Sequence, residues 1–151
     1  MRKIDTIIIH CSATKEGQEI TLDTIRKWHL ARGFNDIGYH FIIHLDGTVE
    51  AGRPVEKIGA HAAPRNTDSI GIVYIGGLDK SGKPKDTRTE SQIKSLIDLI
   101  KILKVQFPIK DIIGHRDISP DKNGNGIIEP FEWLKSCPCF DVKSWVKENK
   151  L

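Results

Sequence analysis

Residues 112–141 read IIGHRDISPDKNGNGIIEPFEWLKSCPCFD. The stretch predicts a short apolar strand ending on His115, then a loop rich in Asp, Asn and Gly, and finally Lys135 and two cysteines, Cys137 and Cys139. Imidazole nitrogen and thiolate sulfur are ligands that zinc prefers in proteins. The stretch therefore joins a buried structural element to candidate metal ligands.

The chain has 151 residues, a length typical of one domain with one hydrophobic core, so we expect a single domain over residues 1–151. Hydrophobic residues make up 38% and charged residues 28%, as in ordinary soluble globular proteins. The net charge of +3 is mild, and no basic module with interleaved aromatic residues is present, which argues against nucleic acid as a partner. We expect a monomer.

The N-terminal sequence MRKIDTIIIHCS has a basic start but only Ile7, Ile8 and Ile9 as an unbroken apolar run. That run is too short for the core of a signal peptide, and no segment is apolar enough to insert into a membrane. We therefore expect synthesis in the cytoplasm. Three cysteines, two of them separated by one proline, argue against a disulfide framework and favour a thiolate with a chemical role.

Strands and helices alternate along the chain around one hairpin, which predicts an α/β fold with a mixed central sheet flanked by helices. The hairpin turn falls at Asp46-Gly47. Thr21 and the Thr89/Gln92 capping box mark two helix starts, and Asp141 marks a third. The predicted strands are 6–10, 39–44, 48–51, 69–75 and 112–113, and the predicted helices are 21–32, 89–107 and the segment after 141.

Two of the six histidines, His10 and His115, each close an apolar strand, where a side chain can project from the sheet edge into a cleft. A catalytic zinc site uses three protein ligands and keeps one position open, and these histidines with one cysteine would supply that set. The residues alone leave other choices. His40 and His44 share one face of their predicted strand, and Cys11 and Cys139 are also available.

Five blocks of sequence together resemble the zinc-dependent N-acetylmuramoyl-L-alanine amidases, a family that includes short phage endolysins and is similar in fold to peptidoglycan recognition proteins. The resemblance runs from about Ile4 to Glu148, and the blocks follow the family order. They are HCSAT (10–14), GYHFIIHLDGTVEAGR (38–53), SIGI (69–72), GHRD (114–117) and KSCPCFDVKSW (135–145).

The resemblance implies zinc ligands at His10, His115 and Cys137. The family's cysteine is the one directly before Pro-x-Phe-Asp, which selects Cys137 over Cys139. In such a site the metal lowers the pKa of its bound water to near 7, so that hydroxide is available as a nucleophile. The implied reaction is hydrolysis of the amide bond between N-acetylmuramic acid and L-alanine in peptidoglycan.

The resemblance also implies catalytic roles for Tyr39 and Lys135 and places His61 in the loop that lines the substrate groove. Lys135 would stabilise the negative charge of the tetrahedral intermediate, and Tyr39 would orient water or relay a proton. A phage or prophage endolysin that acts on the cell wall after release or delivery fits this picture. The alternative is a non-catalytic peptidoglycan-binding module of the same fold, which the presence of Cys137, Tyr39 and Lys135 disfavours.

An insert at about 118–134 departs from the family pattern, because 21 residues separate His115 from Cys137. Its residues match positions 1, 3, 5, 6, 8 and 12 of a calcium loop. A bare Asn/Gly-rich turn is the alternative. The matching residues are Asp121, Asn123, Asn125, Gly126, Ile128 and Glu132. The calcium ligands would be the side chains of Asp121, Asn123, Asn125 and Glu132, the Ile127 carbonyl, and Glu129 directly or through water.

Overall fold

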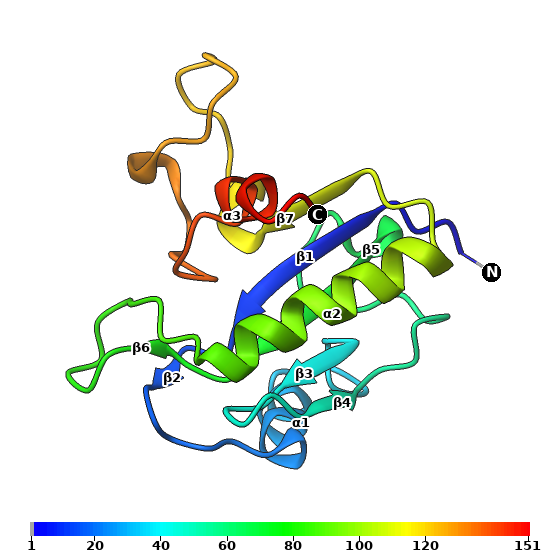
Figure 1. The fold of residues 1–151 in the computed structure, drawn as a ribbon, viewed down its shortest axis with the longest axis vertical. Coiled ribbons are helices and arrows are strands. Elements are labelled where there is room, and N and C mark those ends of the chain that lie inside the picture. The colour runs from blue at the N-terminus through cyan, green and yellow to red at the C-terminus, as the bar shows by residue number, and fades with distance from the viewer. Residues whose placement is uncertain (1) are drawn as a thin grey trace.

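A computed structural model describes residues 2–151 and places a five-stranded sheet at the centre of the molecule (Figure 1). All neighbouring strands are parallel except the β3–β4 hairpin. This is the mixed sheet that the sequence predicts. Its order is β4 (Val49–Ala51), β3 (Phe41–Ile43), β5 (Ser69–Tyr74), β1 (Thr6–Cys11) and β7 (Asp111–Gly114).

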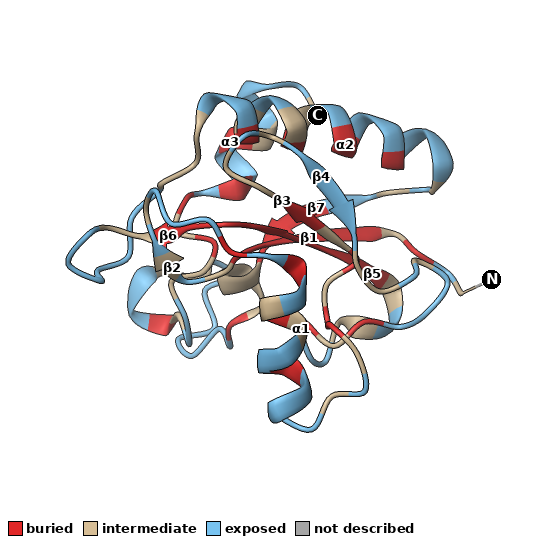
Figure 2. Cartoon of the chain, turned by 90° about the horizontal axis from the view of Figure 1, so that it is seen from below, coloured by how far each residue is buried: buried red, intermediate tan, exposed pale blue. Residues whose placement is uncertain are grey.

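Helices cover both faces of the sheet. Helix α1 (Leu22–Ala31) lies on one face, and α2 (Glu90–Gln106) and α3 (Val142–Glu148) lie on the other (Figures 1 and 2). Strands β1 and β5 are buried along their whole length, as their unbroken apolar sequences indicate. No helix within residues 2–151 is both long enough and apolar enough to cross a membrane.

The alternation of side chains along β1 decides where His10 points. Ile7 and Ile9 belong to the large core under α2 and α3, so Ile8 and His10 project from the opposite face of the sheet. Val73, which pairs with His10 across the β1–β5 ladder, packs on that same α1 side. His10 is thereby directed away from the main core and toward the face that carries α1.

The helix boundaries follow the predicted caps. The Thr21 side chain accepts a hydrogen bond from the Thr24 amide, and the Asp141 side chain accepts one from the Ser144 amide. Both halves of the Thr89/Gln92 capping box are formed. These predictions are confirmed.

Three segments differ from the sequence-based expectation. The predicted strand 39–44 is shorter, because only Phe41–Ile43 pair as β3. Strand β7 ends at Gly114, so His115 begins a 3₁₀ helix, η2 (His115–Ile118), instead of closing the strand. A second, two-stranded sheet forms between β2 (Thr14–Lys15) and β6 (Gly77–Leu78), in segments outside the predicted strands and helices. Two more 3₁₀ turns are η1 (Asn66–Asp68) and η3 (Pro130–Glu132).

Candidate metal centre and cleft

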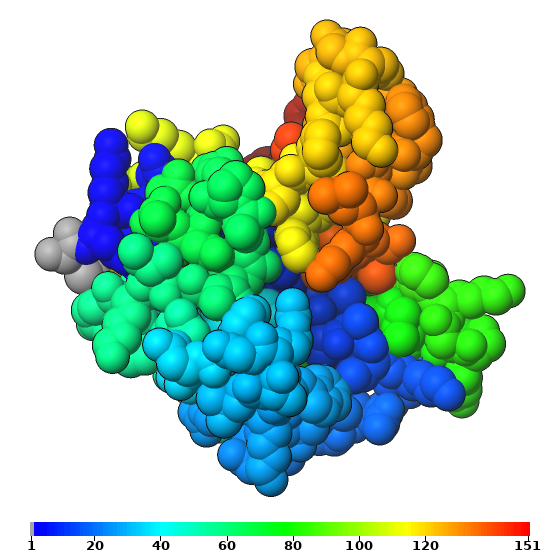
Figure 3. Space-filling model, turned by 180° about the vertical axis from the view of Figure 1, so that it is seen from behind, coloured from blue at the N-terminus to red at the C-terminus, as the bar shows by residue number. Residues whose placement is uncertain are grey.

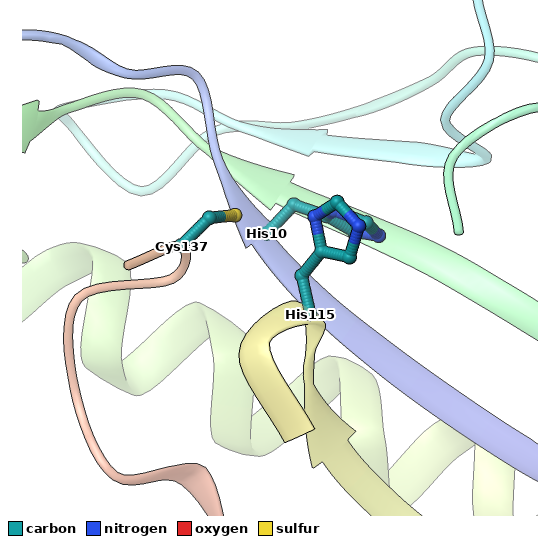
Figure 4. A group of neighbouring side chains, drawn as sticks. All are labelled: His10, His115 and Cys137. Carbon is teal, nitrogen blue, oxygen red and sulfur yellow. The ribbon is translucent and has the colours of Figure 1, made fainter. Parts of the chain in front are cut away.

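His10, His115 and Cys137 form a candidate metal site, the three-ligand cluster: one possible ligand atom from each lies within 4.8 Å of the other two (Figure 4). His10 lies near the end of β1, and His115 follows the end of the adjacent parallel strand β7. Cys137 lies in the segment before α3. Among residues 2–151 this is the one group of three or more His, Cys, Asp or Glu side chains with such spacing.

Hydrogen bonds hold the segment that carries Cys137 against the sheet. The Arg116 amide donates to the Cys137 carbonyl at 2.8 Å, and the buried Tyr74 hydroxyl donates to the Pro138 carbonyl at 2.6 Å. The Cys11 amide donates to the Cys137 sulfur at 3.1 Å. This hydrogen bond holds the Cys137 sulfur next to the end of β1, on the strand that carries His10.

The donor set fits a zinc ion. Imidazole nitrogen and thiolate sulfur are both zinc ligands, and three such ligands leave the fourth position that a catalytic site keeps open. Zinc bond lengths imply ligand separations of roughly 3.3–3.8 Å in a tetrahedral site. The observed limit of 4.8 Å requires only a small contraction. Burial lowers the pKa of His10 well below its usual value, with the nearby His61 and His115 adding to the effect. Burial, helped by the charge of Lys135, lowers the pKa of His115 to about 4. Both rings are therefore neutral at pH 7, as metal binding requires.

The histidines and cysteines left open by the sequence lie outside the cluster. His40 accepts a hydrogen bond from the Gly71 amide through Nδ1, and its Nε2 lies 2.9 Å from the Lys57 carbonyl. Both ring nitrogens of His44 contact carboxylates, those of Glu19 and Glu50. The sulfurs of Cys11 and Cys139 lie 3.9 Å apart beside the cluster.

A cleft of about 510 Å³ opens onto the cluster. Tyr39, His61 and Lys135, which the sequence assigned to the site, all line it, together with His115 and Cys137. The His10 and Tyr39 ring centroids lie 5.1 Å apart. Burial raises the pKa of Tyr39, so its hydroxyl keeps its proton at neutral pH. Lys135 is exposed at the rim.

One wall of the cleft comes from α1 and the residues after it, and none of these residues was predicted from the sequence to belong to the site. Trp28 is 44% exposed and lines the cleft with His29, Arg32 and Phe34. Trp28 and Arg32 are four residues apart and so share a helix face, the one signal available in the sequence. The described lining residues include the cations Arg32 and Lys135 but no carboxylate.

The insert (residues 118–134) stands out from the body beside the cleft (Figure 3), and its geometry does not support the expected calcium site. Glu132 is fully buried, and its two carboxylate oxygens accept hydrogen bonds from the backbone amides of Lys122, Asn123 and Glu129. The Asp121 carboxylate accepts from two backbone amides of the loop. Asn123 Oδ1 and Asn125 Oδ1 accept from the amides of Asn125 and Ile127. Backbone N–H groups thus occupy oxygens that a cation would need.

Comparison with known proteins matches residues 1–126 to a protein family described as N-acetylmuramoyl-L-alanine amidase. The endolysin of Klebsiella phage KP32 is 39% identical over 145 residues, covering 96% of this chain and 87% of that protein. The chain belongs to the N-acetylmuramoyl-L-alanine amidase family. It is an amidase, as the sequence blocks predict, and endolysins of phages are among its relatives.

Solved structures of this amidase family share its fold. The endolysin amidase LysCS from Clostridium intestinale superposes with a TM-score of 0.77 at 26% identity, covering 99% of this chain and 86% of that one. A point mutant of Drosophila PGRP-LB, solved in complex with tracheal cytotoxin, gives 0.71 at 25% identity, covering 97% and 82%. The family match ends at residue 126, inside the insert, so Lys135 and Cys137 lie beyond it.

Proposed function

We propose that this amidase hydrolyses the bond between N-acetylmuramic acid and L-alanine in peptidoglycan with a zinc ion held by His10, His115 and Cys137. The observation that carries the proposal is the convergence of these three side chains, from three separate segments, at the cleft. When bound, zinc polarises an amide carbonyl and lowers the pKa of a water molecule to near 7, which supplies a nucleophile at neutral pH.

The substrate would lie in the cleft beside the cluster. Its lining carries Arg32 and no described carboxylate, a charge balance that suits the carboxylates of a peptidoglycan stem peptide. Trp28 and Phe34 offer apolar surface against which a sugar ring or peptide side chain can pack. That a protein of the same fold was solved in complex with tracheal cytotoxin supports the capacity of this fold to bind such a ligand.

Lys135 would stabilise the charge that develops on the carbonyl oxygen of the scissile amide. Its ammonium group is close enough to the cluster to lower the pKa values of His10 and His115. A fixed cation aimed at a developing oxyanion acts on the transition state more than on the neutral ground state. Lys135 would thus raise the rate of the chemical step rather than the affinity for substrate.

Tyr39 would hold the attacking water or pass a proton to the leaving amine. Its ring packs beside His10 and His29 at the cleft, and its hydroxyl stays protonated at neutral pH. A phenol in that state can donate one hydrogen bond while accepting another. The L-alanine nitrogen needs a proton as the amide bond breaks, and Tyr39 would deliver it from Oη.

The test combines metal analysis with cell-wall digestion on the wild type, Cys137→Ala and the matched control Cys139→Ala. Amide cleavage releases the α-amino group of L-alanine and creates no new reducing sugar, so assays of amino groups and of reducing sugars distinguish it from glycosidic cleavage, and the identity of the new N-terminal residue distinguishes it from cleavage within the stem peptide. We expect wild type and Cys139→Ala to bind about one zinc per chain and to release amino groups. Retention of zinc and activity by Cys137→Ala would refute the proposal. Wall binding without release of amino groups by the wild type would favour the non-catalytic module.

A further inference from the structure

We propose that His61 is a positioning residue for the metal: it fixes the tautomer of His10 in which Nδ1 carries the lone pair that remains to bind the metal. The inference rests on the proposed zinc site. It differs from the role that the family resemblance implies for His61, which is contact with substrate. The hydrogen bonds around the His61 ring carry it.

Ser69 determines which atoms donate and which accept in these hydrogen bonds. Its hydroxyl donates to the Arg65 carbonyl at 2.6 Å, and a hydroxyl has only one proton to give. The Ser69 oxygen, 3.3 Å from His61 Nε2, can therefore only accept in that second contact. It follows that His61 carries its proton on Nε2, which leaves an unprotonated lone pair on Nδ1 of the neutral ring.

The contact between His61 and His10 then sets the tautomer of His10. His61 Nδ1 lies 2.9 Å from His10 Nε2, and because Nδ1 is the acceptor, His10 Nε2 must be the donor. A neutral imidazole has one N–H, so His10 Nδ1 is left with a lone pair. Metal-bound histidines commonly donate their second N–H to a fixed acceptor, which orients the ring and sets the tautomer. His61 provides that acceptor here.

The fold builds a fixed seat for the His61 ring. A Cβ atom at Gly71 would lie 2.6 Å from the ring, and one at Gly59 would lie 2.7 Å from it, so the absence of side chains there makes the space. The side-chain oxygen of Asn66 accepts from the amides of His61 and Ala62, at 3.0 and 2.8 Å. A ring held in place in this way can fix the orientation of the neighbouring His10 ring.

The same contacts argue against direct recognition of substrate by His61. The ring is buried, and both of its nitrogens have partners inside the protein, Ser69 and His10. No nitrogen is left over to bind a sugar or a peptide. His61 lines the cleft, but only its carbon atoms are free to face a ligand.

The experiment measures zinc affinity without substrate, by competition with a chromophoric chelator, for the wild type, His61→Leu, His61→Asn and Ser69→Ala. We expect His61→Leu to weaken zinc binding about 10- to 100-fold, as losses of such supporting partners do. His61→Asn should recover part of that loss, because its Oδ1 can accept from His10 Nε2. Ser69→Ala should weaken binding by only a few-fold, because His61 then loses its tautomer preference but keeps its place.

Absorption spectra of the cobalt(II)-loaded proteins give a second readout, because the visible bands report the ligand geometry. We expect altered bands for His61→Leu and near-normal bands for His61→Asn. Wild-type zinc affinity in His61→Leu with a raised KM would overturn the inference in favour of substrate contact. A lower melting temperature of the metal-free variants with unchanged affinity would overturn it in favour of a purely structural role. Failure of the wild type to bind zinc would instead refute the proposed function itself.

Discussion

Two regions of this amidase carry metal-ligand spacing in their sequence, and the fold treats them differently. The three-ligand cluster draws His10, His115 and Cys137 from segments that are far apart in the chain, and their ligand atoms converge on one point. The insert has its expected ligands within twelve consecutive positions, and their oxygens turn toward the loop's own backbone amides. The comparison shows that ligand spacing is informative when other elements orient the donors.

The difference has a physical cause. In the cluster, the sheet and the Tyr74 and Arg116 hydrogen bonds fix the backbone, and among the described residues a single backbone amide, that of Cys11, donates to one of the three side chains. In the insert, residues 121–129 form no helix or strand, and unpaired amides are costly to bury. The carboxylate of Glu132 and the side chain of Asp121 satisfy several of them. The same oxygens cannot serve a cation at full strength.

The largest effect is expected from removing the thiolate. Cys137→Ser should lower kcat/KM on peptidoglycan by at least about 10³-fold, equivalent to about 4 kcal/mol, because a neutral hydroxyl is a poor zinc ligand. Cys139→Ser is the matched control, since Cys139 contacts Cys11 and not the cluster, and it should keep zinc and activity. Equal losses in both variants would break the distinction between the cluster and its surroundings.

Acid should destabilise the metal-free protein through the histidines of the cleft region. Burial lowers the pKa of His115 and of His40 to about 4 and that of His61 to about 3, from an ordinary value of 6.5. Below about pH 6.5 the unfolded chain binds protons that the folded chain does not, so stability present above that pH falls as pH drops toward 4. For His40 alone, the free energy of unfolding should fall by about 3 kcal/mol as the pH approaches 4. Urea unfolding of chelator-treated protein at several pH values measures it.

His44 provides the internal control for this acid effect. Burial favours its neutral form, but hydrogen bonds to Glu19 and Glu50 outweigh that and raise its pKa. Its contribution is therefore present below about pH 6.5 and is lost as pH rises through its raised pKa. His44→Gln should make the acid loss slightly steeper, by less than about 1 kcal/mol. A stability that is flat between about pH 7 and 5 would contradict the expected effect of the cleft histidines.

Much of the fold could be predicted because its signals are local. Thr21, the Thr89/Gln92 pair and Asp141 cap helices through contacts within a few residues, and the apolar runs of β1 and β5 match strands buried on both faces. The pairing of His10 with His115 was implied by the family resemblance, since the residues alone also left His40 and His44 as choices. The end of β7 at Gly114 was missed by one residue.

What the sequence could not provide depends on packing between distant segments. Trp28 reads as a core residue in the helical period, and only the position of α1 over the sheet turns it toward the cleft. The contact between His10 and His61 joins residues 51 positions apart. For Glu132 the sequence predicted a calcium ligand, whereas its oxygens accept hydrogen bonds from backbone amides. The position of Glu132 in the loop pattern is the same in both cases, so the pattern could not distinguish them.

Removing the charge of Lys135 should slow the chemistry while leaving the cluster intact. Lys135→Met should lower kcat about 100-fold, near 2.7 kcal/mol, with little change in KM or zinc content, because its cation would act on the transition state. Lys143→Met is the control, since Lys143 is exposed in α3 and does not line the cleft. Loss of zinc from Lys135→Met would mean that Lys135, which follows the insert directly, holds the metal-bearing segment in place.

The smallest effect is expected in the insert, and it tests the other half of the comparison. Glu132→Gln replaces one acceptor oxygen with a donor and leaves backbone amides without partners. The free energy of local opening of the insert should therefore fall by about 1–2 kcal/mol. Hydrogen exchange at the Lys122 and Glu129 amides measures this. Glu129→Gln is the control, because its carboxylate accepts from asparagine side chains alone.

Calcium at about 1 mM, a concentration that saturates many extracellular calcium loops, should leave the wild-type exchange pattern unchanged. Glu132 already directs both oxygens at backbone amides, and a cation would have to displace them. Calcium-dependent protection of residues 121–132 that disappears in Glu132→Gln would show that the insert rearranges around an ion. The two regions would then differ only in when their ligands assemble, the cluster during folding and the insert on binding.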